Sequence, residues 1–155
     1  MPFFTLPSRQ PAAVAPATTP PPAASTPVAD GAHTILVVDD SAMFRKAVTQ
    51  ALLDQHYIVV QAENGRLALE TWEREPKRFA LVISDVFMPE MDGLSLGREL
   101  RRRDRTLPIA LMSSKLDEDS RWIAEEAGFR LLPKPFKDAY LVELVARMIK
   151  TRPAR

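Results

Sequence analysis

Five short apolar runs, each followed by a segment of helical periodicity, constrain the fold of this chain more than any other feature of its sequence. The runs are rich in branched aliphatic residues, as in TILVV at 34–38 and FALVIS at 79–84. Continuously apolar runs of this length are typical of strands buried on both faces of a parallel sheet. After the first run, apolar residues recur at the spacing of one helical face, at Phe44, Ala47, Val48, Ala51 and Leu52. Five such units between residues 34 and 150 predict an α/β fold, a doubly wound parallel sheet.

The order of the strands follows from the rules for connecting parallel strands. Right-handed crossovers and a flavodoxin-like strand order of 2-1-3-4-5, with five helices, place the first and third strands side by side. The run RLLP at 130–133 then becomes an edge strand. Pro133 is tolerated there because a proline has no N–H to donate to a neighbouring strand.

Periodicity and breaker residues place the later helices. We expect them at about 94–103, 117–127 and 137–150, and the last is predicted to bury Leu141, Leu144, Val145, Met148 and Ile149. The motif MDG at 91–93 is interpreted as a turn that needs glycine at Gly93. Trp122 is expected to be a partly buried residue at the edge of its helix.

The first 33 residues differ in composition from the rest of the chain. They are mainly proline, alanine, serine and threonine, with charged side chains only at Arg9 and Asp30. Such a segment buries too little apolar surface to offset the entropy of ordering it. We therefore interpret residues 1–33 as a disordered Pro/Ala-rich tail and residues 34–152 as one folded domain. The opening MPFFTL is interpreted as a frayed terminus, or as a segment that docks on a partner.

Charge and cysteine content exclude several classes of function. The formal net charge is +1, which gives no electrostatic case for a nucleic-acid or membrane partner. The basic run RRRDR at 101–105 is interpreted as the solvated end of a helix. The absence of cysteine excludes disulfides and thiolate metal sites and fits a cytoplasmic location. No apolar stretch approaches the roughly 18 residues that a membrane span requires.

Polar side chains follow the strands at the points where they end. Asp39 and Asp40 follow the first strand, Asp85 ends the third, Ser113 ends the fourth, and Lys134 follows the fifth. The carboxyl ends of parallel strands meet at one edge of the sheet, where this fold class binds ligands. Three carboxylates gathered there repel one another unless a hard cation such as Mg²⁺ joins them. With an ammonium and a hydroxyl beside it, this arrangement can hold a phosphoryl group, which makes Asp85 a candidate nucleophile.

Four motifs carry a resemblance to a known family. ILVVDDSAMFRKAV, VISDVFMPEMDG, LPIALMSS and LPKPF occur in this order and at a spacing similar to that of the receiver domain of two-component response regulators. The chain resembles the chemotaxis-type, single-domain members, over about residues 34–150.

The resemblance implies a phosphoacceptor and a magnesium site. Asp85 matches the residue that is phosphorylated. Asp40 matches a direct ligand of Mg²⁺, Asp39 a ligand acting through water, and the backbone carbonyl of Phe87 a third ligand.

The resemblance also implies how the phosphoryl group is sensed. Ser113 matches the switch hydroxyl, and Lys134 matches the lysine that pairs with the phosphate, followed by a cis bond to Pro135. The family usually has an aromatic residue where this chain has Leu131, so an aromatic-type switch is not expected to operate in its usual form. Phe129 is a weak alternative for that role.

Two further positions are expected to tune the lifetime of the phosphorylated state. Phe87 and Lys115 match positions that flank the path of the hydrolysing water in the family. A bulky Phe87 and a long Lys115 are therefore expected to slow dephosphorylation.

The family suggests the partners and the class of function. A histidine kinase or phosphotransfer protein donates the phosphoryl group, and the downstream protein contacts helix 117–127, strand 130–133 and helix 137–150. No sequence follows Arg155, so we expect no output domain and signalling through protein contacts. Enzymatic activity beyond self-phosphorylation and autodephosphorylation is not expected. The alternatives are a constitutive receiver-like scaffold, and an aspartyl-nucleophile phosphatase of the D-x-D type, in which Phe87 occupies the place of the second acid.

Overall fold

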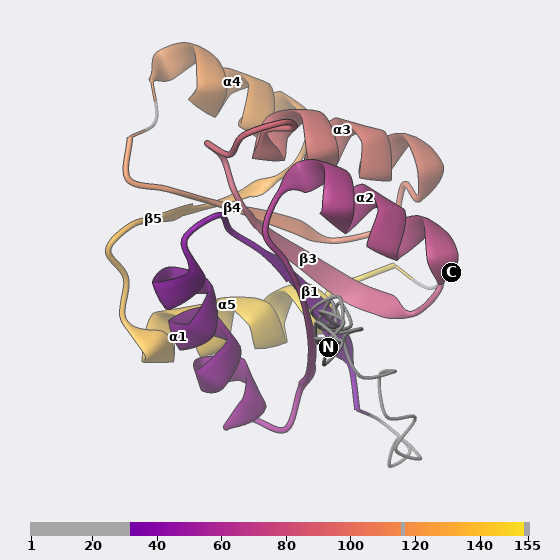
Figure 1. Ribbon diagram of the computed structural model, residues 1–155, viewed down its shortest axis with the longest axis vertical. Coiled ribbons are helices and arrows are strands. Elements are labelled where there is room, and N and C mark those ends of the chain that lie inside the picture. Colours follow the sequence, from indigo (N-terminus) through magenta and orange to yellow (C-terminus); the bar gives the residue numbers. More distant parts are fainter. Residues whose placement is uncertain (1–31, 116, 154–155) are drawn as a thin grey trace, which may run out of the picture.

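The computed structural model describes residues 32–115 and 117–153. Five parallel strands form one sheet in the order β2-β1-β3-β4-β5, as predicted (Figure 1). The strands are β1 (Thr34–Val38), β2 (Ile58–Ala62), β3 (Phe79–Asp85), β4 (Ile109–Ser113) and β5 (Arg130–Pro133). The helices are α1 (Ala42–Leu53), α2 (Gly65–Arg74), α3 (Gly93–Arg103), α4 (Glu118–Glu126) and α5 (Asp138–Lys150).

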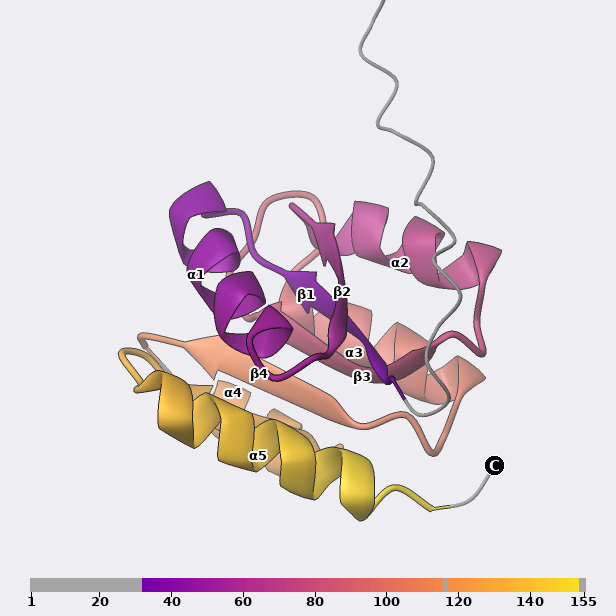
Figure 2. The ribbon, with the colours of Figure 1, turned by 90° about the horizontal axis from the view of Figure 1, so that it is seen from below.

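The helices cover both faces of the sheet. Helices α1 and α5 lie on one face, and α2, α3 and α4 lie on the other (Figures 1 and 2). Alternate residues of β1 therefore enter two different cores, Ile35 and Val37 on the side of α1 and α5, and Leu36 and Val38 on the opposite side. Burial on both faces explains why the strands are continuously apolar.

The strand register decides which side chains meet at the carboxyl edge. Val38 pairs with Ser84, Asp85 pairs with Met112, and Ser113 pairs with Pro133. The residues that follow these pairs therefore emerge at one level, and Pro133 lies on the edge strand as expected. The Lys134–Pro135 bond is cis, also as expected.

Side-chain caps start four helices close to the strand ends. The side chains of Ser41, Asn64, Asp92 and Asp117 each accept a hydrogen bond from a backbone N–H in the first turn of α1, α2, α3 and α4. A cap of this kind satisfies an N–H that the helix itself leaves unpaired.

The burial predicted for four residues was wrong. Ala47 is exposed, because the buried stripe of α1 includes the polar Thr49, which a count of apolar residues misses. Trp122 is 64% exposed on the outer face of α4, whose fully buried residue is the small Ala124. On α5, Leu144 and Ile149 are only partly buried at the margin of the core.

Some sequence predictions fall outside what the structure describes. The predicted tail, apart from residues 32 and 33, and its MPFFTL segment lie outside the described residues. Of the helices within the described ranges, none combines the length and apolar character that crossing a membrane demands.

Gly93 is required for a different reason from the one predicted. Its φ is not positive, so no left-handed turn demands glycine there. A Cβ at Gly93 would instead lie 2.1 Å from the backbone oxygen of Asp85. The first turn of α3 therefore packs directly on the backbone of the residue that ends β3.

The replacement Gly93→Ala is expected to lower the free energy of unfolding by about 3 kcal/mol or more. The new Cβ would overlap the backbone oxygen of Asp85, so the start of α3 and the end of β3 would have to move apart. Gly128→Ala is the matched control. Gly128 has a φ of 72° but open space around its Cβ position, so the cost there is only about 1 kcal/mol of backbone strain. Chemical denaturation of both variants checks this ranking, and an equal loss in the two would contradict it.

Candidate functional site

Three carboxylates gather at the carboxyl edge of the sheet. Asp39, Asp40 and Asp85 each offer an oxygen, and these oxygens lie within 4.8 Å of one another. Asp39 is completely buried and Asp85 is 8% exposed, whereas Asp40 is exposed. The acids therefore form an anionic pit with a buried floor and one open side. The prediction from the sequence that these three carboxylates lie together is confirmed.

Lys134 places a positive charge in the same pit. Its Nζ lies 3.1 Å from Oδ2 of Asp39 and 3.3 Å from Oδ1 of Asp85. The lysine thus joins the acid after β1 to the acid that ends β3. One ammonium cannot balance three carboxylates, so the pit keeps a formal charge of about −2.

Phe44 supports the lysine and was not identified as a site residue from the sequence. Lys134 Nζ lies 3.9 Å from the centre of the Phe44 ring, which also makes an edge-to-face contact with Phe136. A cation over an aromatic face is attracted by the negative charge of that face. The helical periodicity placed Phe44 on the buried face of α1 but carried no signal of this contact.

Only one of the two carboxylate oxygens of Asp85 contacts a hydrogen-bond donor among the described residues. The backbone N–H of Val86 donates to Oδ1 over 3.0 Å, on the same oxygen that faces Lys134. Oδ2 receives no hydrogen bond from the described residues. The structure therefore leaves one oxygen of Asp85 available for a new bond.

The environment of Asp85 opposes ionisation. Burial, the largest effect, raises the pKa of the Asp85 carboxyl above its usual value. Attraction to Lys134 lowers that pKa, and repulsion from Asp39 raises it again. The net shift is upward, so the ionised carboxylate is less favourable here than in water.

Asp39 both lines the pit and helps to start α1. Its Oδ1 accepts a hydrogen bond from the backbone N–H of Ser41 over 2.8 Å, while the hydroxyl of Ser41 accepts from the N–H of Phe44. Arg45, which sequence reasoning also missed, donates to the backbone carbonyl of Asp39. The buried acid is therefore held in place by the N-cap and the first turn of α1.

Ser113 lies at the edge but faces the following loop. Its hydroxyl donates to the carbonyl oxygen of Lys115 over 2.7 Å and accepts from the N–H of the same residue over 3.1 Å. The N–H of Lys134 donates to the carbonyl oxygen of Ser113 over 2.8 Å, which ties the end of β5 to the end of β4.

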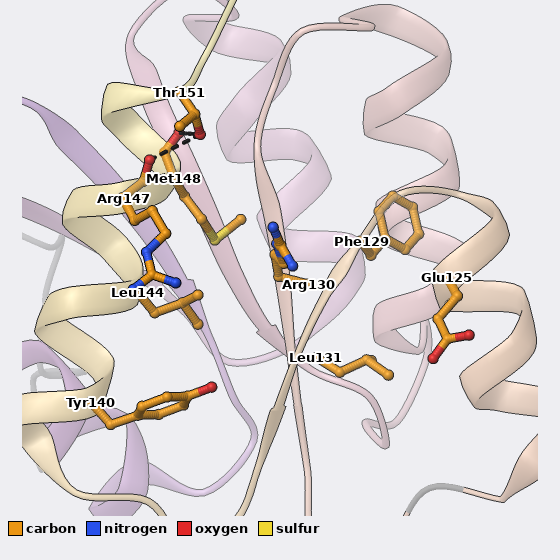
Figure 3. A pocket seen from close by; sticks show the side chains of 9 residues that line it. All are labelled: Glu125, Phe129, Arg130, Leu131, Tyr140, Leu144, Arg147, Met148 and Thr151. Atoms are coloured by element: carbon orange, nitrogen blue, oxygen red, sulfur yellow. Dashed lines mark hydrogen bonds between the residues drawn. The ribbon is translucent and has the colours of Figure 1, made fainter.

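The remaining predicted positions lie around the pit and on the adjoining face. Phe87 is 55% exposed in the loop after β3, and Lys115 is exposed in the loop after β4. Leu131 lines a cavity between α4, β5 and α5 (Figure 3). Phe129 is buried, and a Cβ on Gly97 of α3 would lie 2.9 Å from its ring, so Phe129 is a packing residue on the α3 side of the sheet.

The donor set fits a hard divalent cation. Among the described residues the pit offers three carboxylates and neither histidine nor cysteine, and oxygen ligands of this kind are preferred by Mg²⁺. The charge of about −2 that Lys134 leaves uncompensated is the charge that a divalent ion neutralises.

A family model described as "Response regulator receiver domain" matches residues 35–146, which contain all five strands except the first residue of β1. The chain belongs to this family. Receiver domains are in general non-enzymatic phosphoacceptors of two-component systems and interact with histidine kinases or phosphotransfer proteins.

Curated receiver proteins of two kinds are similar to this chain. The chemotaxis protein CheY of Bacillus subtilis is 34% identical over 122 residues, which are 76% of this chain and 98% of that protein. The sensor kinase CckA of Brucella abortus is 36% identical over 121 residues, which are 77% of this chain and 13% of that protein. The chain spans less than half of the length of several curated relatives, among them transcriptional regulators.

Solved receiver structures have the same fold. The chemotaxis protein CheY4 of Vibrio cholerae superposes with a TM-score of 0.70 at 30% identity, over 76% of this chain and 99% of that one. The signal receiver domain of a histidine kinase from Syntrophus aciditrophicus superposes with a TM-score of 0.71 at 33% identity, over 79% and 96% of the two chains.

The variant Asp85→Asn is expected to be more stable than the native chain at neutral pH without Mg²⁺. The pKa of Asp85 is higher in the fold than in the unfolded chain, so its ionised form costs stability above that pKa, and a neutral amide escapes the cost. We expect the midpoint of thermal unfolding to rise by about 3–5 °C, the shift that about 1 kcal/mol causes in a domain of this size.

Added magnesium is expected to reverse this order of stability. Added Mg²⁺ should raise the midpoint of the native chain more than that of Asp85→Asn, because a ligand that binds the folded state more tightly stabilises it more. Scanning calorimetry with and without the ion measures both effects. An Mg²⁺ shift of the same size in the two proteins would argue against a metal site at Asp85.

Proposed function

We propose that this receiver domain is a phosphorylation-activated switch, and that Asp85 accepts the phosphoryl group from a histidine kinase or phosphotransfer protein. The proposal is supported chiefly by the pit in which Asp39, Asp40 and Asp85 converge around Lys134. Neither a lone carboxylate at a strand end nor a lone lysine supports it, because both are common without function. Their meeting at 3.1–3.3 Å in a buried pit is what favours phosphoryl chemistry.

The transfer uses the free oxygen of Asp85. Oδ2 attacks the phosphorus of a phosphohistidine, the phosphorus–nitrogen bond of the donor breaks, and its electron pair stays on the imidazole, which takes up a proton from water. The product is an acyl phosphate on Asp85. The ammonium of Lys134 stands beside the new phosphoryl oxygens, having faced Asp85 beforehand. Mg²⁺ held by Asp39, Asp40, Asp85 and the carbonyl of Phe87 would supply positive charge toward those oxygens.

The phosphoryl group acts on the rest of the domain through Ser113. In the unphosphorylated chain this hydroxyl is occupied by the backbone of Lys115. A phosphoryl oxygen on Asp85 offers a charged and therefore stronger acceptor. The hydroxyl then leaves the carbonyl of Lys115, and the β4–α4 loop moves with it. Lys134, bonded by its N–H to the carbonyl of Ser113, passes the change to the end of β5.

The downstream partner binds the face formed by α4, β5 and α5. A cavity of about 360 Å³ lies on this face, with Leu131 of β5 and Tyr140 of α5 in its lining (Figure 3). Tyr140 is 51% exposed, which suits an aromatic contact residue. Leu131 has no ring to turn inward, so the change in this cavity follows the loop movement rather than an aromatic rotamer.

The alternative functions gain no support from the site. A constitutive scaffold does not require Asp39, Asp85 and Lys134 to form a buried charged cluster. A phosphatase of the D-x-D type needs an acid two residues after its nucleophile, and Phe87 stands there. The cytoplasmic location expected from the composition stays a prediction.

The proposal is tested by intact mass after incubation with Mg²⁺ and a small phosphodonor such as acetyl phosphate. The native chain is expected to gain one phosphoryl group, and Asp85→Asn is expected to gain none. Asp92→Asn is the matched control, because Asp92 lies in the loop that follows Asp85 but caps α3, a role that asparagine retains. An adduct on Asp85→Asn, or none on the native chain and the control, would refute the assignment.

The side chain of Phe87 is expected to lengthen the life of the acyl phosphate. The 55% exposed ring stands two residues from Asp85 and shields the approach of water. Phe87→Asn should shorten the lifetime by up to about tenfold, which corresponds to about 1.4 kcal/mol in the barrier to hydrolysis. The decay of the phosphorylated mass measures this, with Met43→Asn as a control at another exposed apolar position. An unchanged lifetime would show that Phe87 does not tune the reaction.

A further inference from the structure

The basic run at the end of α3 is not a uniform solvated surface. Arg102 and Arg103 pair with Glu99, and Arg103 also pairs with Glu73 of α2. Arg101 instead turns toward the core, where its guanidinium lies 5.5 Å from the centre of the Phe129 ring. The run therefore divides into outer arginines that are neutralised and an inner arginine that faces a cavity.

That cavity lies at the amino end of β4 and is lined by four arginines. It has a volume of about 190 Å³, and its basic lining residues are Arg101, Arg105, Arg130 and Arg152. These arginines come from α3, the α3–β4 turn, β5 and the segment after α5. Residues far apart in the sequence thus place positive charge around one cavity. We call this cavity the arginine groove.

Arg152 has a structural role in the groove. Its guanidinium lies 3.0 Å from Oδ2 of Asp104 and donates to the backbone carbonyl of Phe79 over 3.0 Å. Asp104 is not itself a lining residue, and the lining contains no acidic side chain. The carboxylate of Asp104, which lies next to the groove, thus pairs with Arg152. Arg152 in turn anchors the segment after α5 to the start of β3.

The other three arginines form no direct ion pair among the described residues. Within residues 32–115 and 117–153, no carboxylate lies within 4.0 Å of the guanidinium groups of Arg101, Arg105 or Arg130. The Nε of Arg101 is buried and has no hydrogen-bond partner. Burial lowers the pKa of Arg101, and attraction to Asp104 offsets that effect only in part. The partly buried Arg101 and the exposed Arg105 and Arg130 thus line one cavity without a direct ion pair, an arrangement that suits the binding of an anion.

We propose that the arginine groove binds the diphosphate group of a small soluble ligand. Guanidinium groups recognise phosphate oxygens through paired N–H donors, and several of them around one concavity favour a multiply charged anion. A single phosphate monoester carries about −1.5 to −2 at pH 7, so a diphosphate matches three unpaired cations better than a carboxylate or a monophosphate does. The volume of about 190 Å³ is below that of pockets for drug-sized ligands, which suits a small anionic group.

The groove is separate from the acid pit. It opens at Ile109, whereas the pit lies beyond Ser113, about 13 Å away along β4. Arg130, Met148 and Thr151 line both the groove and the cavity on the α4–β5–α5 face. Figure 3 shows the Arg130 side chain rising from β5 toward the end of α5 that carries these two residues. An anion bound by Arg130 would therefore alter one wall of that cavity without touching Asp85.

The test is isothermal titration calorimetry of the full chain with inorganic pyrophosphate, at constant ionic strength and without Mg²⁺. The double variant Arg105→Gln with Arg130→Gln removes two unpaired cations at exposed positions. The double variant Arg98→Gln with Arg102→Gln removes the same charge from the exposed surface of α3. We expect one pyrophosphate per native chain, affinity weakened about tenfold or more by the first pair, and affinity unchanged by the second.

Further titrations distinguish this proposal from alternative explanations. Inorganic phosphate should bind more weakly than pyrophosphate, and Asp85→Asn should bind pyrophosphate as the native chain does. No binding, equal losses in the two double variants, or equal affinity for phosphate and pyrophosphate would overturn the proposal. Binding to phosphatidylglycerol vesicles but not to pyrophosphate would also overturn it, in favour of a lipid surface. None of these outcomes depends on whether Asp85 is phosphorylated.

Discussion

Two buried carboxylates, Asp39 and Asp85, share the single ammonium of Lys134, and the site depends on this charge balance. A buried carboxylate without a partner costs several kcal/mol, so both acids depend on a nearby positive charge. Lys134 lies 3.1 Å from one and 3.3 Å from the other, yet the pKa of Asp85 is still raised. With the exposed Asp40 included, negative charge remains in excess. This excess of negative charge favours the binding of a cation. The bound cation would then favour a phosphoryl group on Asp85, whose oxygens can contact both the cation and Lys134.

Much of the surrounding structure keeps these groups in position. The parallel register brings the ends of β1 and β3 to one level, and the N–H of Lys134 bonds to the carbonyl of Ser113 at the end of β4. Gly93 lets α3 pack on the backbone of Asp85, and the ring of Phe44 covers the ammonium. The restraints come from separate elements, so the geometry of the pit is set before any ligand arrives. This is the preorganisation on which electrostatic stabilisation of a phosphoryl group relies.

The two ends of the sheet carry opposite charge. Three acids lie at the carboxyl end, while Arg101, Arg105 and Arg130 lie near the amino end of β4 and β5 and form no direct ion pair among the described residues. The formal net charge of +1 conceals this separation, because it sums over the whole chain. The α4–β5–α5 cavity lies between these ends and shares Arg130 with the arginine groove. Phosphorylation of Asp85 and an anion bound in the arginine groove would therefore both act on the α4–β5–α5 face.

The sequence by itself determined the fold class, the strand order and the acids of the pit. Burial on both faces forces continuous apolar strands, and chain connectivity then places Asp39, Asp40, Asp85 and Lys134 at strand ends that must share an edge. These inferences succeed because strand periodicity and strand termini are local properties of the chain. The cis bond before Pro135 followed from the family motif rather than from periodicity.

Only the tertiary structure decided the contacts made between elements. It placed Phe44 on Lys134, turned Ser113 toward Lys115, exposed Ala47 and Trp122, and assigned Gly93 to a close approach instead of a turn. It also divided RRRDR into paired and unpaired arginines, which the spacing along α3 does not distinguish. The reason is physical: the partner of a side chain is chosen by the distances at which helices and strands pack, and residues far apart in the sequence set those distances.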